Sequence, residues 1–173
     1  MQRFVAFLRA VNVGGTGKLP MSDLKSLCEQ LGFTCVETYI ASGNVVFNSD
    51  LPTAKIQKLL EQQLFAYAGK AVGVHIRSAA ELRAVLAGNP FPKAAGNHNL
   101  VIFLDGAPPA DALLKATGQV DETMALGTCE IYVHYGEGMG KSKLKIPAAK
   151  HGTARNMNTV AKLVQMSSAS PSP

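Results

Sequence analysis

The chain has 173 residues, of which 47% are hydrophobic, 17% charged and only 6% aromatic. This composition can bury a core of aliphatic side chains and excludes a chain that is disordered throughout. No apolar run reaches the roughly 18 residues of a membrane span, and Arg9 interrupts the N-terminal apolar run too early for a signal peptide. We therefore expect a cytoplasmic protein with no membrane partner.

The formal net charge is +5, and the positive excess is confined to the C-terminal part of the sequence. From Gly138 onward there is no Asp or Glu, whereas the same stretch contains Lys141, Lys143, Lys145, Lys150, Arg155 and Lys162. A concentrated positive field favours an anionic partner. The alternative is a solvated basic surface that has no partner.

Cysteine and histidine spacing gives no support for a metal site or a disulfide framework. Cys28, Cys35 and Cys129 have no CxxC spacing and are odd in number, which is typical of reduced thiols. The four histidines are scattered and contain no i, i+4 pair. We expect neither a metal nor a cofactor.

The first half of the chain has a β-α-β-β-α-β pattern. Strands are expected at residues 3–11, 34–40, 44–48 and 71–76, and helices at residues 21–31 and after Pro52. This order is typical of a ferredoxin-like domain. Two helices would cover one face of its sheet, and the other face needs a further layer, a partner or solvent.

The second half repeats this outline after a third helix and a connector. Ser78 and Glu81 have the spacing of a capping box at the start of that helix, residues 78–88. A strand at 99–105, a short helix at 109–117, a hairpin at 122–134 and a last helix at 156–166 follow, with no closing strand.

The expected fold class is α+β. It consists of two ferredoxin-like units of βαββαβ type, with antiparallel sheets, helices on one face and an apparent internal duplication. The expected boundaries are an N-terminal unit at 1–77, a helix and connector at 78–97, a C-terminal unit at 98–166 and a disordered tail at 167–173.

Five segments spread over nearly the whole chain carry a resemblance to a known family. They are Phe7–Gly15, Tyr39–Phe47, Asn89–Phe91, Lys141–Leu144 and Thr153–Val160. Together these segments resemble the bacterial domain of unknown function 1697. The resemblance implies two ferredoxin-like units and no established activity, cofactor or substrate. Met157 is a departure, because the family usually has Trp there.

The first candidate binding segment is the glycine-rich loop between the first strand and the first helix. Its candidate ligand-binding residues are Arg9, Asn12, Gly14, Gly15 and Lys18. Glycines let backbone N–H groups face an anion, and a helix N-terminus adds a favourable dipole. Walker spacing is absent, because that motif requires Gly at Asn12 and Ser or Thr after Lys18. The alternative is a flexible glycine turn.

Three further segments contain candidate ligand-binding residues. They are Lys141, Ser142 and Lys143 in a second glycine-rich loop, Arg155, Asn156, Asn158 and Thr159 near the last helix, and Ser42 and Asn44 in the first hairpin. Arginine offers a planar fork for a phosphate or carboxylate. Helix capping is the alternative explanation for the late Asn and Thr residues, and a tight turn for the hairpin residues.

No catalytic centre is evident in the sequence. There is no GxSxG motif and no paired carboxylates for acid–base chemistry. The polar segments consist of hydrogen-bond donors, which favours binding of an anionic ligand: a nucleotide, a phosphorylated metabolite or a nucleic-acid backbone. An enzyme acting on a small phosphorylated or carboxylated metabolite is a second possibility, with its site between the early loop and Arg155. A protein-interaction scaffold is a third.

Overall fold

The computed structural model describes residues 1–14 and 17–168 and contains two four-stranded antiparallel sheets. The chain forms two compact units, Met1–Arg83 together with the segment from Leu163 onward, and Ala84–Lys162. Their boundaries fall inside helices α3 (Ala79–Ala87) and α4 (Met157–Ser168). Within the described part of the chain, no helix is long and apolar enough to cross a bilayer.

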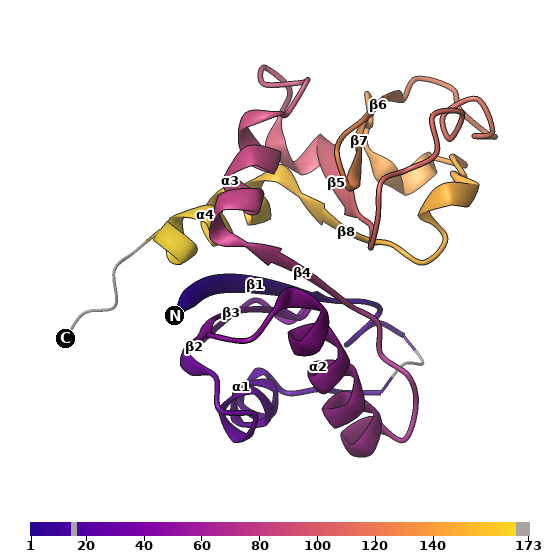
Figure 1. The fold of residues 1–173 in the computed structure, drawn as a ribbon. Helices are drawn as coiled ribbons and strands as arrows, with labels where there is room; N and C mark the ends of the chain where they lie inside the picture. The colour runs from indigo at the N-terminus through magenta and orange to yellow at the C-terminus, as the bar shows by residue number, and fades with distance from the viewer. Residues whose placement is uncertain (15–16, 169–173) are drawn as a thin grey trace. The chain divides into compact units, whose positions relative to one another are not determined.

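The N-terminal unit has the element order that the sequence predicts. Its elements are β1 (Gln2–Leu8), α1 (Met21–Gln30), β2 (Thr34–Tyr39), β3 (Asn44–Ser49), α2 (Thr53–Ala68) and β4 (Val74–Ser78). The strands lie in the order β2-β3-β1-β4. Helices α1 and α2 lie side by side on one face of this sheet (Figure 1).

The core of this unit lies between the sheet and its two helices. Phe4, Ala6 and Leu8 alternate along β1 toward the helices and are buried there, which is the period of two that a strand imposes. The intervening residues Val5 and Phe7 are also fully buried. Both faces of β1 are therefore apolar, which explains why its sequence reads as a continuous apolar run.

Arg3 ties the C-terminal end of α4 to the first sheet. Its Nη2 lies 2.6 Å from Glu37 Oε1 on β2 and 3.4 Å from the backbone oxygen of Met166, and its Nη1 donates to the backbone oxygen of Cys35. A cation at a helix C-terminus also opposes the negative end of the helix dipole. These contacts help to explain why the last turns of α4 belong to the N-terminal unit.

The start of α3 confirms the predicted capping box. The Ser78 N–H donates to Glu81 Oε2 at 2.7 Å, and the Glu81 N–H donates to Ser78 Oγ at 3.2 Å. The reciprocal pair satisfies two N–H groups that the helix leaves unbonded.

The C-terminal unit contains β5 (Asn99–Phe103), β6 (Thr123–Leu126), β7 (Glu130–His134) and β8 (Thr153–Asn156), in the order β6-β7-β5-β8. Strand β8 lies before α4, in a segment where the sequence predicts no strand. It has only four residues without an apolar alternation, so its pairing with β5 identifies it and its sequence does not.

The helix predicted at residues 109–117 is wrong, because this segment forms turns. Thr117 and Lys145 exchange two backbone hydrogen bonds of 2.9 and 2.8 Å, which hold the segment against residues 144–149. Leu113, Leu144 and Ile146 pack on one face of the sheet. Irregular segments therefore cover the face that helices were expected to cover.

Helix α4 extends further than predicted. Ser167 is buried and its hydroxyl donates to the backbone oxygen of Val164 at 3.0 Å, so the helix includes the first two residues of the expected disordered tail. The rest of that prediction concerns residues 169–173, which lie outside the described residues.

The turn between β2 and β3 requires glycine at position 43. Gly43 has φ of +85°, and a Cβ added there would lie 2.6 Å from Val11 Cγ2 and 2.8 Å from Leu8 Cβ. We expect Gly43→Ala to lower the free energy of unfolding by about 2 kcal/mol or more, because it combines a left-handed backbone with a steric overlap. Urea denaturation measures the change. Gly106→Ala is the control, since its added Cβ meets nothing within 4 Å; an equal loss in both variants would contradict the prediction.

Candidate functional site

The side chain of Asn12 joins three segments at one end of the first sheet. Its Nδ2 donates to the backbone oxygens of Leu19 and Ala41, both at 2.8 Å, and its Oδ1 accepts the Leu19 N–H at 2.7 Å. One amide thus fastens the end of the glycine-rich loop to its beginning and to the β2–β3 turn. Its donors and its acceptor bind backbone, so Asn12 shapes the loop.

The backbone is strained at the same end of the sheet. Ala10, Asn12 and Ile40 have φ of 54°, 54° and 50°, although none of them is glycine. A left-handed conformation costs a residue other than glycine about 1–3 kcal/mol, and is least common for a β-branched side chain such as that of Ile40. Such outliers occur often at ligand-binding sites; of the four in the described chain, these three lie near the Asn12 loop and the fourth, Cys35, lies in β2.

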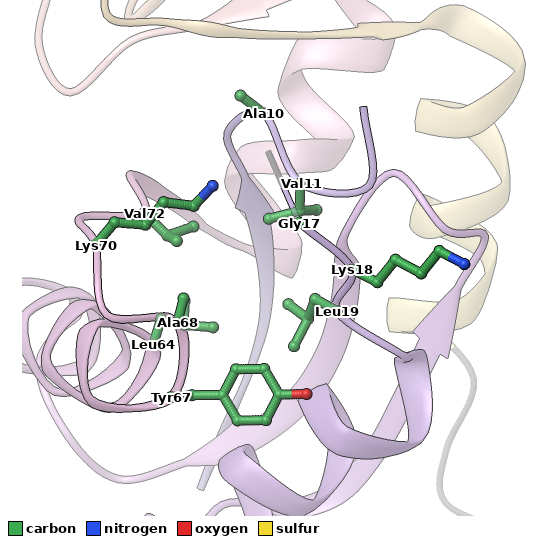
Figure 2. A pocket seen from close by; sticks show the side chains of 10 residues that line it. All are labelled: Ala10, Val11, Gly17, Lys18, Leu19, Leu64, Tyr67, Ala68, Lys70 and Val72. Atoms are coloured by element: carbon green, nitrogen blue, oxygen red, sulfur yellow. The ribbon is translucent and has the colours of Figure 1, made fainter. Parts of the chain in front are cut away.

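A hollow of about 330 Å³ lies between this loop and the end of α2 (Figure 2). It is lined by Ala10, Val11, Gly17, Lys18 and Leu19 from the loop, by Leu64, Tyr67 and Ala68 from α2, and by Lys70 and Val72 beyond it. We call this hollow the loop pocket. Its walls are mainly apolar, and lysine is the only charged residue type among the described lining residues.

The side chains of Lys18 and Lys70 point in different directions. In Figure 2 the side chain of Lys70 extends from the far side of the loop pocket toward Val11, whereas that of Lys18 extends away from the pocket. Lys70 is therefore the better placed ammonium for a ligand inside the pocket. Lys18 contributes its backbone and aliphatic stem to the wall.

Tyr67 forms the wall below these lysines. Its hydroxyl donates to Asp23 Oδ2 at 2.6 Å, and this hydrogen bond to a carboxylate raises the pKa of Tyr67 above its ordinary value. The contact joins the end of α2 to the first turn of α1. The phenol ring is left as a flat apolar surface facing the pocket (Figure 2).

A second hollow of about 620 Å³ lies on the other side of the loop. It is lined by Asn12, Val13, Gly14, Gly17, Lys18, Leu19, Pro20, Met21 and Ala41. The segment 17–19 lines both hollows and forms the wall between them. Three of the residues predicted from the sequence, Asn12, Gly14 and Lys18, thus line this pair of hollows, while Gly15 lies outside the described residues.

The hairpin residues have local roles. The Nδ2 of Asn44 donates to the backbone oxygen of Tyr39 at 2.9 Å and to Ser42 Oγ at 3.0 Å, and Asn44 is fully buried. These bonds close the turn. A tight turn is the alternative explanation that the sequence offers for Ser42 and Asn44. Arg9 is exposed, and its backbone N–H donates to the oxygen of Gly73.

The second glycine-rich loop is fastened to an acidic residue of the same unit. Ser142 Oγ donates to Glu122 Oε1, and the N–H of Val120 donates to Glu122 Oε2. These hydrogen bonds, led by that of Ser142, hold the pKa of Glu122 below its ordinary value. The neighbouring Lys141 and Lys143 are exposed.

The residues around Arg155 form a third group, in β8 and the start of α4. Arg155 is 7% exposed, and its Nη1 donates to Thr153 Oγ1 at 2.8 Å and to the oxygen of Ala154 at 2.9 Å. Burial lowers the pKa of Arg155 to about 10. The Thr159 N–H donates to Asn156 Oδ1 at 2.9 Å, which caps α4. Asn158 is exposed.

Sequence reasoning missed the α2 side of the loop pocket. Tyr67 follows Leu64 by three residues, a spacing that places it on the same helix face and suggests a core residue. The structure leaves it 44% exposed at the end of the helix. Lys70 stands in the short link that precedes β4, and no motif marks it. Tyr67 and Lys70 can be recognised as pocket residues only from the packing of the loop against α2.

A metal site is not apparent among residues 1–14 and 17–168, where no group of three or more His, Cys, Asp or Glu side chains could hold an ion. The charged side chain that extends across the loop pocket is that of Lys70 (Figure 2), and an ammonium group suits an anion better than a cation.

Comparisons with known proteins identify a family and a fold. The family described as protein of unknown function (DUF1697) matches residues 1–132. A conserved bacterial protein from Streptococcus pneumoniae is similar in structure, with a TM-score of 0.79 and 27% sequence identity, over 96% of this chain and 98% of that one. No curated protein matches the chain.

Asn12→Ala tests the role of the Asn12 amide. The substitution leaves the Leu19 N–H and two backbone oxygens without their partner, so we expect the free energy of unfolding to fall by about 1–3 kcal/mol. Urea denaturation measures this loss. Asn97→Ala is the control, because Asn97 is an exposed amide; if Asn12→Ala costs no more than the control, the amide does not hold the loop.

Glu122→Gln tests the link between the two loops of the C-terminal unit. Because the pKa of Glu122 is lowered from 4.5, its stabilisation is present above about pH 4.5 and is lost as the pH falls through the lower folded value. The wild type should therefore exceed Glu122→Gln in free energy of unfolding at pH 7, and the gap should close in acid. Chemical denaturation across pH measures it, with Glu137→Gln as the exposed control. A gap that is independent of pH would contradict the assignment.

Proposed function

Since the chain belongs to the DUF1697 family, whose description names no activity, we propose from the geometry that it binds a small anionic metabolite with an apolar body in the loop pocket. The observation that carries this proposal is the combination of apolar walls with the Lys70 side chain extending across a hollow of about 330 Å³. Such a volume is that of a small-molecule site, which is usually apolar with a few placed polar groups.

The apolar lining selects the body of the ligand. Val11, Leu19, Leu64 and Val72 surround the hollow, and the ring of Tyr67 offers a flat face. Burying an alkyl or ring group there contributes about 25 cal/mol for each Å² removed from water. A fully hydrated polar ligand would gain little from these walls.

The charged lining selects the polar end of the ligand. The Lys70 ammonium attracts a phosphate or carboxylate, and a hydrogen bond to a charged group contributes about 1.5–3 kcal/mol. Asp23 lies nearby, but its carboxylate accepts the hydroxyl of Tyr67. This pairing reduces the repulsion that an incoming anion would meet.

A hollow of this size favours a small molecule over a nucleic-acid backbone. Backbone binding needs several cations in a row along a surface, whereas Lys18 and Lys70 are the charged residues at this hollow. The exposed lysines 141 and 143 belong to the other unit. We therefore assign the anionic-ligand function to the N-terminal unit.

We also infer that both units follow one ferredoxin-like plan that arose by duplication. Leu8 donates its N–H to Gly43 in one hairpin and Leu104 donates to Cys129 in the other, at 2.8 and 2.9 Å. Arg77 pairs with β1 and Arg155 with β5 at matching positions of the two sheets. This correspondence supports a common origin.

A thermal-shift screen tests the proposed ligand class. We expect selected phosphorylated or carboxylated compounds with an apolar group to raise the melting temperature, because a ligand that binds only the folded state stabilises it. Lys70→Gln should weaken the best compound about tenfold or more, since 1.4 kcal/mol is a factor of ten in affinity. Lys55→Gln is the control, an exposed lysine of α2 that does not line the pocket.

A second variant locates the site. Ala68→Phe places a ring at the loop pocket, so it should abolish the shift while leaving the melting temperature of the unliganded protein unchanged. Equal shifts in the wild type, Lys70→Gln and Ala68→Phe would contradict the proposal, as would a screen in which only short nucleic acids stabilise the protein with a steep salt dependence.

A further inference from the structure

A third hollow, of about 410 Å³, lies between α2 and the link that leads into β4. Residues 71–73 form part of its wall, and the rest comes from four residues of α2: Lys58, Glu61, Gln62 and Phe65. These four have the i, i+3, i+4, i+7 spacing of one helix face. It is not the face that buries Leu60 and Leu64 in the core. We call this hollow the α2 pocket, and its volume is that of a small-molecule site.

The Glu61 carboxylate is held at the start of β4. Its Oε1 accepts the backbone N–H of Val74 at 3.3 Å, and the side chain is half-buried. This bond uses one of the two carboxylate oxygens. In the segments that the structure describes, the carboxylate makes no other hydrogen bond or ion pair. Its Oε2 therefore remains an acceptor at the wall of the α2 pocket.

Lys58 brings the opposite charge to the same helix face. It precedes Glu61 by three residues, a spacing that places the two Cβ atoms about 5–6 Å apart. Lys58 is exposed. Among the described residues, no ion pair joins its ammonium group to Glu61 or to another carboxylate. The α2 pocket thus carries one cation and one anion that do not neutralise each other.

The aromatic part of the wall lies one turn after Glu61. Phe65 is 56% exposed although it is a large apolar side chain, and Val72 beside it in the lining is buried. Covering the exposed ring with an apolar group of a ligand removes apolar surface from water, which is favourable. The face of an aromatic ring also attracts a cation. The pocket therefore combines two opposite charges with an apolar surface.

We propose that the α2 pocket binds a compact zwitterion, an ammonium and a carboxylate group on a small apolar body, as in a free amino acid. The ligand ammonium donates to Glu61, its carboxylate lies against Lys58, and its apolar group covers Phe65. Glu61 repels a simple anion and Lys58 repels a simple cation, whereas a zwitterion satisfies both charges. This ligand class differs from that of the loop pocket, whose described lining contains no acidic residue.

Leucine and phenylalanine test the proposal, each compared with its N-acetyl derivative, which lacks the ammonium, and its amide, which lacks the carboxylate. Titrations of the full chain followed by ¹H–¹⁵N spectra measure affinity and location. We expect a free amino acid to shift the backbone signals of Ala71 and Gly73. Both derivatives should bind about tenfold or more weakly, because each loses a hydrogen bond to a charged group. If neither amino acid shifts these signals, or if the derivatives bind equally well, the proposal is overturned.

Two charge-removing variants assign the groups. Glu61→Gln keeps an oxygen that can accept the Val74 N–H, so it should fold and lose the discrimination between amino acid and N-acetyl derivative. Lys58→Gln should lose the discrimination between amino acid and amide. Lys55→Gln and Glu137→Gln are the controls, because both residues are exposed and neither lines the α2 pocket. Unchanged discrimination in both folded pocket variants would contradict the assignment.

Lys70→Gln separates the α2 pocket from the loop pocket. Lys70 lines the loop pocket and not the α2 pocket, so this variant should bind the free amino acid with unchanged affinity. A tenfold loss in Lys70→Gln without any loss in Lys58→Gln would place the amino acid in the loop pocket and overturn the proposed site. Failure of amino acids to bind leaves the anion-binding proposal for the loop pocket intact.

Discussion

The amide of Asn12 is the constraint on which the candidate site depends. Three hydrogen bonds from one side chain fix where the glycine-rich loop returns and where the β2–β3 turn approaches it. The left-handed backbone at Ala10, Asn12 and Ile40 costs free energy, and these bonds offset part of that cost. Without these hydrogen bonds nothing fixes the position of Leu19 relative to α2, and the loop pocket has no defined shape.

Gly43 and Asn12 shape this region in two different ways. Gly43 allows the turn to approach Leu8 and Val11 more closely than any side chain permits, and Asn12 then binds the turn through the backbone of Ala41. Steric access and hydrogen bonding thus act on the same few residues. This explains how the two described ends of the loop, at Asn12 and Leu19, are held at the edge of an apolar core.

The sequence predicted most of the N-terminal unit because its strands and helices have clear periods of 2 and 3.6. Leu24, Leu60 and the alternation along β1 lie where those periods place them. Prediction failed where pairing over long distances decides the structure, as in β8 and residues 109–117. The sequence marks the glycine-rich loop by a local signal, whereas Tyr67 and Lys70 reach the loop pocket only because α2 packs beside that loop.

The wall formed by Gly17, Lys18 and Leu19 separates two hollows and belongs to both. A compound that pushes this wall outward from one side reduces the space on the other side by the same movement. Occupancy of the two hollows would then be thermodynamically linked, and linkage is reciprocal: each occupant changes the affinity of the other by the same factor.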